Sequence, residues 1–336
     1  MAQLSVTQRA LPLSLAVAGS HATLEVITQI LPVVYPLLIA ERGFTYSQIG
    51  TVALVSSLCY GLTQPLFGWL SDHLDAKKIV VASIAWTAIS ISLVGWIGAY
   101  GLLLACIGLV ELGSAAYHPS GASLAARFER KSQSMAHFAT GGFLGSALSP
   151  VIIAALLTQF GLRGTLGMLP IGLALAGLVA ISLRHMPAAK SPHLTTATQA
   201  QGSKLALTLI VLMIGAKIWF EGSLVSYLPE WQIQQGDSLT AAGSILALFL
   251  VALGVGGFIS GFLSERFGQF WVVLISLILL PPIYLLFLNG DPMISPTALF
   301  VCGVLLGISN PISILMAQAA WPQGVGVASS MAIGIG

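Results

Sequence analysis

The stretch Gly68-Trp69-Leu70-Ser71-Asp72-His73 ends one apolar run of this sequence, and Gly261-Phe262-Leu263-Ser264-Glu265-Arg266 ends another. Both read as a glycine, two apolar residues, a serine, an acid and a histidine or arginine. Their acids lie 193 positions apart. A motif that returns at the same place relative to an apolar run indicates an internal repeat.

Two further pairs repeat at nearly the same spacing. His118-Pro119 matches Asn310-Pro311 at an offset of 192 positions, and Gly19-x-His21-x-x-x-Glu25 matches Gly215-x-Lys217-x-x-x-Glu221 at an offset of 196. Each pair joins one apolar run to the sixth run after it. The sequence therefore predicts a duplicated six-helix unit.

The composition places these runs in a membrane. Of 336 residues, 56% are hydrophobic and only 7% are charged, against about 25% charged in a soluble domain. A membrane-spanning helix needs about 20 apolar residues, and a barrel strand about half as many. The runs have the helical length, so we expect an all-α polytopic membrane protein. The predicted spans are 11–39, 47–70, 79–98, 102–126, 135–160, 164–183, 205–229, 240–264, 270–288 and 296–320.

The one polar linker divides the chain. We expect a six-helix half over 1–183, a linker over 184–204 and an incomplete second half over 205–336, of about four and a half helices. An eleventh span begins near Val327, so we expect the chain to be truncated within the eleventh helix.

The positive charges set the expected orientation. Ten of the 13 lysines and arginines fall on one side of the predicted spans and two on the other, with Lys217 inside a span. Because cytoplasmic loops carry the excess of basic residues, we expect a cytoplasmic N-terminus and linker. Each half then begins inside, which makes them parallel repeats. We expect a multi-pass protein of the plasma (inner) membrane.

The first stretch, continued through Leu74-Asp75-Ala76-Lys77-Lys78, resembles the signature loop Gly-x-Leu-x-Asp-Arg-x-Gly-Arg-Arg/Lys-Arg/Lys of the major facilitator superfamily. His73, Asp75 and Ala76 depart from it. An acid at the end of a span can cap a neighbouring helix or pair with an arginine, so we assign this loop and its weaker second copy to gating. The gating candidates are Gly68, Asp72, Lys77, Lys78, Gly261, Glu265 and Arg266.

The first half also resembles the fosmidomycin-resistance-type transporters. The resemblance rests on Ser20-His21 with Glu25, on Tyr35-Pro36-Leu37-Leu38, on Gly113-Ser114-Ala115-Ala116-Tyr117-His118-Pro119, and on a fifth-span pattern like a degenerate antiporter motif. Glu111 and Ser120 depart from that family. The resemblance implies proton-driven efflux of drugs or small metabolites. The fifth-span residues, which we also expect to let helices pack closely, are Gly141, Gly142, Gly145 and Pro150.

Ionisable residues inside spans are functional candidates because burying them in a bilayer is costly. Glu25 lies four positions after His21, so both share a helix face, and either group can exchange protons. Lys217 and Glu221 have the same spacing, and we expect an ion pair. The sequence leaves open which carboxylate carries the proton.

Glu111 and His118 lie seven positions, or about two helical turns, apart, so we expect both near the cavity. His118 either binds a proton or substrate, or bonds carbonyls freed by Pro119. Asn310 occupies the matching place in the second half and cannot titrate.

The leading hypothesis is a proton-coupled antiporter that exports a drug or small metabolite. The alternative is a proton-coupled uptake symporter for an organic acid or sugar, which Lys217 keeps open, and a membrane-embedded enzyme or a sensor is a third. The sequence has no P-loop, no basic patch for nucleic acid and no metal-ligand spacing among its cysteines. We expect no enzyme activity and no cofactor or metal, a small-molecule substrate and protons as partners in the bilayer, and a monomer.

Overall fold

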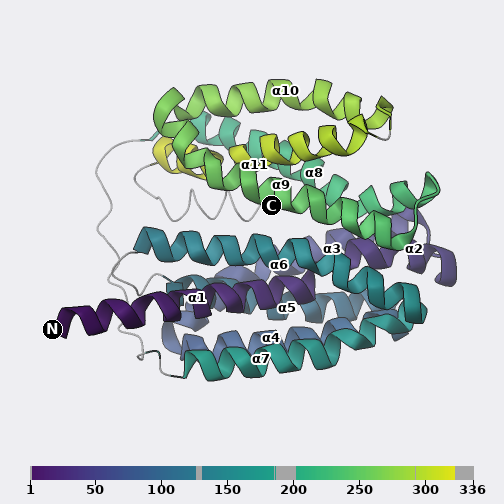
Figure 1. Ribbon diagram of the computed structural model, residues 1–336, viewed down its shortest axis with the longest axis horizontal. Coiled ribbons are helices and arrows are strands. Elements are labelled where there is room, and N and C mark those ends of the chain that lie inside the picture. The colour runs from purple at the N-terminus through teal and green to yellow at the C-terminus, as the bar shows by residue number, and fades with distance from the viewer. Residues whose placement is uncertain (1, 126–130, 185, 187–201, 292, 322–336) are drawn as a thin grey trace. The chain divides into compact units, whose positions relative to one another are not determined.

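The structure is a computed structural model that describes residues 2–125, 131–184, 186, 202–291 and 293–321. Over these residues the chain is helical and contains no strand, which confirms the all-α prediction. Two short 3-10 helices, η1 and η2, accompany the α-helices (Figure 1). The elements are α1 (Ala2–Thr28), α2 (Leu31–Arg42), α3 (Tyr46–His73), α4 (Ala76–Ser92), η1 (Val94–Trp96), α5 (Tyr100–Ala125), α6 (Lys131–Phe160), η2 (Gly161–Gly167), α7 (Met168–Leu183), α8 (Lys204–Gln234), α9 (Leu239–Phe267), α10 (Gln269–Asn289) and α11 (Ile294–Ala320).

Nine stretches of the described residues are long and apolar enough to cross a membrane. Eight of them correspond one to one with predicted spans. The ninth, His137–Leu183, is 47 residues long and contains both the fifth and the sixth predicted spans, joined through η2. The expected eleventh span lies outside the described residues, as does most of the linker.

The first predicted span is two helices in the structure. Pro32 lacks the N–H that would continue the hydrogen-bond ladder to Thr28, so α1 ends at Thr28 and α2 begins at Leu31. Gly43 then adopts a left-handed conformation, with φ of 69°, and ends α2. The break leaves His21 and Glu25 on the last two turns of α1.

The chain forms two compact units. The first contains Met1–Ser191 and Leu228–Ala247, and the second contains Pro192–Tyr227 and Leu248–Gly336. The adjoining ends of α8 and α9 thus belong to the first unit, where the Tyr46 hydroxyl donates to Glu230 Oε1 at 3.0 Å.

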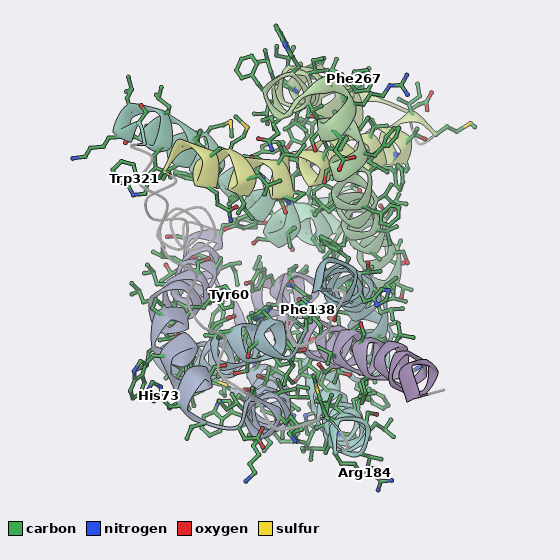
Figure 2. The ribbon with its side chains drawn as sticks, turned by 90° about the vertical axis from the view of Figure 1, so that its left-hand side faces the viewer. Tyr60, His73, Phe138, Arg184, Phe267 and Trp321 are labelled. Atoms are coloured by element: carbon green, nitrogen blue, oxygen red, sulfur yellow. The ribbon has the colours of Figure 1, made fainter. Side chains whose placement is uncertain are left out.

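Helix α1 forms the centre of the first unit (Figure 1). It packs most extensively against α6 and also contacts α4, α5 and α7. Its Val17, Leu24 and Ile27 are fully buried. In contrast, His73 and Arg184 are exposed at the periphery (Figure 2). A polar residue on the inner face of α1 is therefore surrounded by other helices.

In the second unit, α10 packs against α11. Val273 belongs to one buried cluster with Ile312, and Ile214 of α8 belongs to another with Ala317. Large apolar side chains remain outside: Phe258 is 82% exposed and Trp219 is 80% exposed. Such exposure suits contact with lipid, which is as apolar as these side chains.

Candidate functional site

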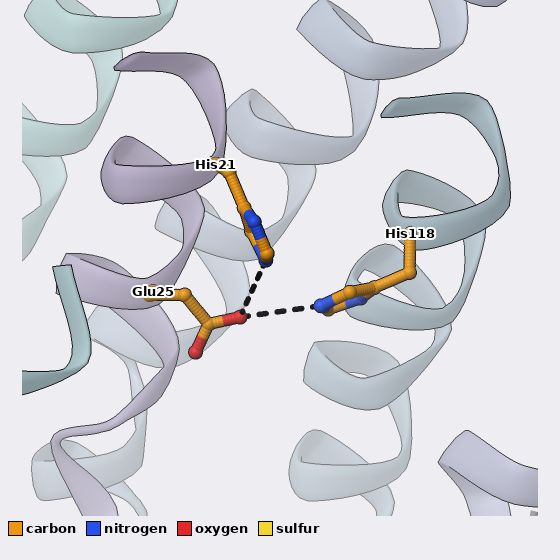
Figure 3. Close-up of side chains that lie close together, drawn as sticks. All are labelled: His21, Glu25 and His118. Carbon is orange, nitrogen blue, oxygen red and sulfur yellow. Dashed lines mark hydrogen bonds and ion pairs between the residues drawn. The ribbon is translucent and has the colours of Figure 1, made fainter. Parts of the chain in front are cut away.

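Three ionisable side chains meet in the first unit, and we call them the histidine–glutamate cluster: His21, Glu25 and His118 (Figure 3). His118 Nε2 lies 3.2 Å from Glu25 Oε1, and His21 Nε2 lies 3.4 Å from the same oxygen. Glu25 is only 7% exposed. Helix spacing brings His21 beside Glu25, and His118 reaches it from α5.

The second carboxylate oxygen of Glu25 has its own donors. Gln29 Nε2 donates to Oε2 at 3.0 Å, and Ser146 Oγ donates to it at 3.1 Å. Gln29 lies one turn after Glu25, and Ser146 comes from α6. These two bonds orient the carboxylate and leave Oε1 for the two imidazoles.

The backbone fixes which nitrogen of each imidazole faces Glu25. His21 Nδ1 lies 2.8 Å from the carbonyl oxygen of Phe138, and His118 Nδ1 lies 2.9 Å from that of Ser114. Because a carbonyl oxygen only accepts, both Nδ1 atoms carry the hydrogen. In a neutral imidazole the other nitrogen then has a lone pair. When both imidazoles are neutral, both Nε2 atoms therefore direct a lone pair at Glu25 Oε1.

Three electron-rich atoms can meet only if positive charge lies between them. With both imidazoles neutral and Glu25 ionised, the cluster has a charge of −1 and neither Nε2 contact is a hydrogen bond. One proton satisfies one contact and neutralises the cluster, and a second proton satisfies the other. Two imidazoles and a carboxylate, each with a ligating atom within 4.8 Å of the others, are also a donor set that suits a divalent cation.

Aromatic rings hold the two histidines. The His21 ring stacks on Phe138 with centroids 4.1 Å apart and an interplanar angle of 18° (Figure 2 labels Phe138). The rings of Tyr60 and Tyr117 meet His118 edge-on, at 5.5 and 5.6 Å. The sequence patterns did not predict these ring contacts or the contacts of Gln29 and Ser146 with Glu25. Of these, only Gln29 left a signal, its position four residues after Glu25.

The fifth-span glycines lie where α6 passes α1. A Cβ at Gly141 or Gly145 would collide with the backbone carbonyl of Ala18 or Ala22. A Cβ at Gly142 would meet the His21 ring instead, 2.5 Å from Cε1. Gly141 and Gly145 thus allow close contact between α6 and α1, and Gly142 leaves room for the imidazole of His21.

Pro150, the last of the fifth-span residues, is buried. Its carbonyl oxygen lies 2.8 Å from where a Cβ on Gly243 would be, so the first turns of α9 approach α6 closely there.

Glu111 lies apart from the cluster. Although it is seven positions from His118, its carboxylate accepts a hydrogen bond from Ser56 on α3. His118 faces α1 instead. Glu111 therefore forms a second, half-buried acidic site in the first unit and does not hydrogen-bond to the first site.

The second unit contains the repeat-related residues, which we call the lysine–asparagine cluster: Lys217, Glu221 and Asn310. Lys217 Nζ donates to Asn310 Oδ1, and Asn310 Nδ2 donates to Glu221 Oε2 at 3.4 Å. The expected ion pair between Lys217 and Glu221 was therefore wrong in its geometry, because an amide from α11 bridges the two charges.

In the gating loop, the acid that caps a helix is Asp75. Its Oδ1 accepts from the backbone N–H of Lys77 at 3.1 Å and so begins α4. Lys77 Nζ donates to the carbonyl oxygen of Met186 at 2.8 Å, which ties this loop to the chain just after α7. The side chain of Asp72 lies outside the described part of the structure. Lys78 is exposed.

A Cβ at Gly68 or Gly261 would have no neighbour within 4 Å, so neither glycine is required by close packing among the described atoms. Glu265 and Arg266 are exposed at the end of α9, and the Arg266 guanidinium lies 5.5 Å from the ring of Phe267. The second copy of the loop therefore presents its charges to the surroundings of the second unit.

Comparison with known proteins agrees with this architecture. The sequence profile of the Major Facilitator Superfamily matches residues 17–336. The fosmidomycin resistance protein of Escherichia coli (strain K12) is 25% identical over 330 residues, which cover 95% of this chain and 81% of that protein. The probable sulfoacetate transporter SauU of Cupriavidus necator is 25% identical over 258 residues, covering 69% of this chain and 59% of SauU.

Solved structures share the fold. A bacterial homologue of the human lysosomal transporter Spinster, inward-facing and occupied, has a TM-score of 0.76 at 18% identity, with 98% of this chain and 78% of that chain covered. The nucleoside transporter NupG also has a TM-score of 0.76, at 15% identity, with 97% and 87% covered.

Proposed function

The chain belongs to the major facilitator superfamily and is a multi-pass membrane transporter, and we propose that it exports a small organic molecule in exchange for protons. One observation carries the proton coupling. In the histidine–glutamate cluster, two imidazole nitrogens with fixed lone pairs converge on one carboxylate oxygen. That arrangement needs positive charge between its atoms, which a proton supplies when it binds and removes when it leaves.

The charge of the cluster supports exchange rather than permanent loading. A buried site surrounded by apolar helices favours the neutral state, which holds one proton. A second proton gives the cluster a charge of +1, which is costly in this setting, so the second proton is the one that exchanges. We infer that the cluster accepts a proton when the site is open to the acidic side and releases it when the site opens to the other side.

The relatives support export. One matching protein is named for resistance to fosmidomycin, and export lowers the internal concentration of a toxic compound. The excess of positive charge on one side of the spans supports a cytoplasmic N-terminus, and we propose that the protein lies in the plasma (inner) membrane. We propose that the protein acts as a monomer and uses the proton gradient instead of a bound cofactor.

The test is antiport in inverted membrane vesicles with an acidic lumen. Phosphonate and lipophilic drugs, fosmidomycin first, are added while lumenal pH is followed with a fluorescent dye. We expect compound-dependent proton release from the wild type. Glu25→Gln, which keeps the shape of the side chain but not its charge, is expected to abolish it.

Glu41→Gln is the matched control, because Glu41 is exposed at the end of α2. Both variants are compared at equal amounts in the membrane, and a chelator is added in one arm to detect a divalent cation held by the cluster. Gradient-driven export by Glu25→Gln at the wild-type rate would refute the coupling role. If activity disappears with the chelator and returns with added metal, the cluster binds a divalent cation, and the proposal that it binds only protons is refuted.

The alternative is proton-coupled uptake of an organic acid. It is favoured by the buried ammonium of Lys217 and by the name of the sulfoacetate transporter relative. Counterflow of labelled sulfoacetate into proteoliposomes distinguishes it. Sustained accumulation driven by an inward proton gradient would replace export as the direction of transport.

A further inference from the structure

The two clusters occupy equivalent places in the repeat but differ in chemistry. Lys217 and Glu221 stand 196 positions after His21 and Glu25, and Asn310, like His118, directly precedes a proline. The first cluster consists of two imidazoles and a carboxylate. The second replaces one histidine with the amine of Lys217 and the other with the amide of Asn310, which cannot titrate. The repeat has therefore produced two polar sites with different ligands.

The lysine–asparagine cluster leaves donors unused. A lysine ammonium has three N–H donors, and one of them is bonded to Asn310 Oδ1. Among the side chains that the structure describes, no second acceptor hydrogen-bonds this ammonium, although Lys217 is only 5% exposed. A buried charge with so few direct partners is costly, so an anionic group beside this ammonium would be stabilised.

Glu221 is not hydrogen-bonded directly to the Lys217 ammonium. Its Oε2 meets the Nδ2 of Asn310 at 3.4 Å, and the amide separates it from the ammonium. A rotation of the Asn310 amide about its terminal torsion would exchange Oδ1 and Nδ2, so that Nδ2 would face the Lys217 side of the cluster. The ammonium and the amide would then offer several donors to one group, and carboxylate, sulfonate and phosphonate groups accept such bonds.

We propose that Lys217 and Asn310 bind the anionic group of the transported molecule, so that the second unit recognises substrate while the first carries protons. This inference rests on the proposed function, and it narrows the substrate to small organic anions. Glu221 repels the bound anion and weakens its binding. The anion of the cargo and the protons therefore use separate sites.

Equilibrium binding tests this assignment without a proton gradient. Benzoate, benzenesulfonate and phenylphosphonate are titrated into purified full-length protein in detergent, followed by calorimetry and thermal shift. Benzamide and benzenesulfonamide are the neutral probes of matched shape. We expect saturable binding of at least one anion and about tenfold weaker binding of its neutral counterpart. The preferred anion identifies the charged group of the substrate.

The variants give opposite signs. Lys217→Met is expected to weaken anion binding about tenfold or more, Lys217→Arg to retain it, and Glu221→Gln to tighten it about tenfold. Lys204→Met is the matched control, because Lys204 is exposed at the start of α8. Lys217→Met with Glu221→Gln removes both charges and keeps the test valid if the single variant fails to fold.

Equal affinity for anions and amides, wild-type anion affinity in the Lys217→Met and Glu221→Gln double variant, or no binding of any anion at millimolar concentration would each overturn the assignment. The outcome is separate from that of the vesicle test. Lys217-dependent binding without antiport would retain the site and reject proton coupling. Antiport that depends on Glu25 but shows no anion binding would reject only the site.

Discussion

Replacing Gly142 with alanine tests whether His21 must hold its present position. Gly142 lies one turn after Phe138 on α6, and His21 Nδ1 lies 2.8 Å from the Phe138 carbonyl oxygen. An added Cβ would stand 2.5 Å from Cε1 and 2.8 Å from Nδ1 of that ring. Ordinary contact needs about 3.5 Å, so the ring must retreat by roughly 1 Å.

That retreat would break the bond that fixes the His21 tautomer. Losing a buried hydrogen bond costs about 1–3 kcal/mol, and we expect proton-coupled export to fall about five- to hundredfold. The assay is compound-dependent proton release in inverted vesicles, normalised to protein in the membrane. Thermal unfolding of the purified protein shows whether the fold survives.

A double-mutant cycle makes the prediction specific. If Gly142 acts through the imidazole, then Gly142→Ala should have little further effect in a His21→Ala background, where the space is free. Gly141→Ala, which meets the Ala18 backbone instead, should destabilise the protein in both backgrounds. Wild-type antiport in Gly142→Ala, or the same loss with and without His21, would refute the reasoning.

Three further predictions concern the cluster, the gating loop and the orientation. Ser146→Ala removes a donor from Glu25 Oε2 and should slow proton release about tenfold at unchanged protein yield; an unchanged rate would show that Gln29 alone orients the carboxylate. Asp75→Ala should lower the stability of the protein by about 1 kcal/mol through loss of the α4 cap, measured by thermal unfolding, whereas Asp75→Asn should retain most of it; equal losses would argue against capping. With the three native cysteines replaced, an impermeant maleimide on intact cells should label Gln235→Cys and spare Lys78→Cys, and the reverse pattern would invert the proposed topology.

The sequence was sufficient for the spans and the repeat because both depend on patterns along the chain. Apolar length identifies a crossing, and a spacing of four residues places His21 beside Glu25 whatever surrounds them. The same logic could not foresee that His118 would complete the first cluster while Glu111 turned to Ser56 on α3. Periodicity fixes the face of a helix that a residue occupies, but which helix meets that face depends on packing.

The second cluster shows the same limit. Lys217 and Glu221 have the spacing of a helical ion pair, and nothing in that spacing indicates an amide between them. Asn310 reaches them from a helix that begins 73 positions after Glu221. The linkage depends on how α8 and α11 pack, which the order of residues alone does not specify.

The hydrogen bonds of the two histidines to backbone carbonyl oxygens affect whether protons can leak through the protein. A histidine conducts protons when it receives one at one ring nitrogen and passes another on from the opposite nitrogen. Here the Nδ1 atoms of His21 and His118 both donate to backbone carbonyl oxygens. A carbonyl oxygen cannot donate a proton, so it cannot relay one to or from these rings. In the proposed proton exchange, each ring would therefore take up and return its proton through Nε2 alone. Under the proposed mechanism the cluster would therefore end a proton path rather than continue one, and we expect an idle protein not to dissipate the proton gradient.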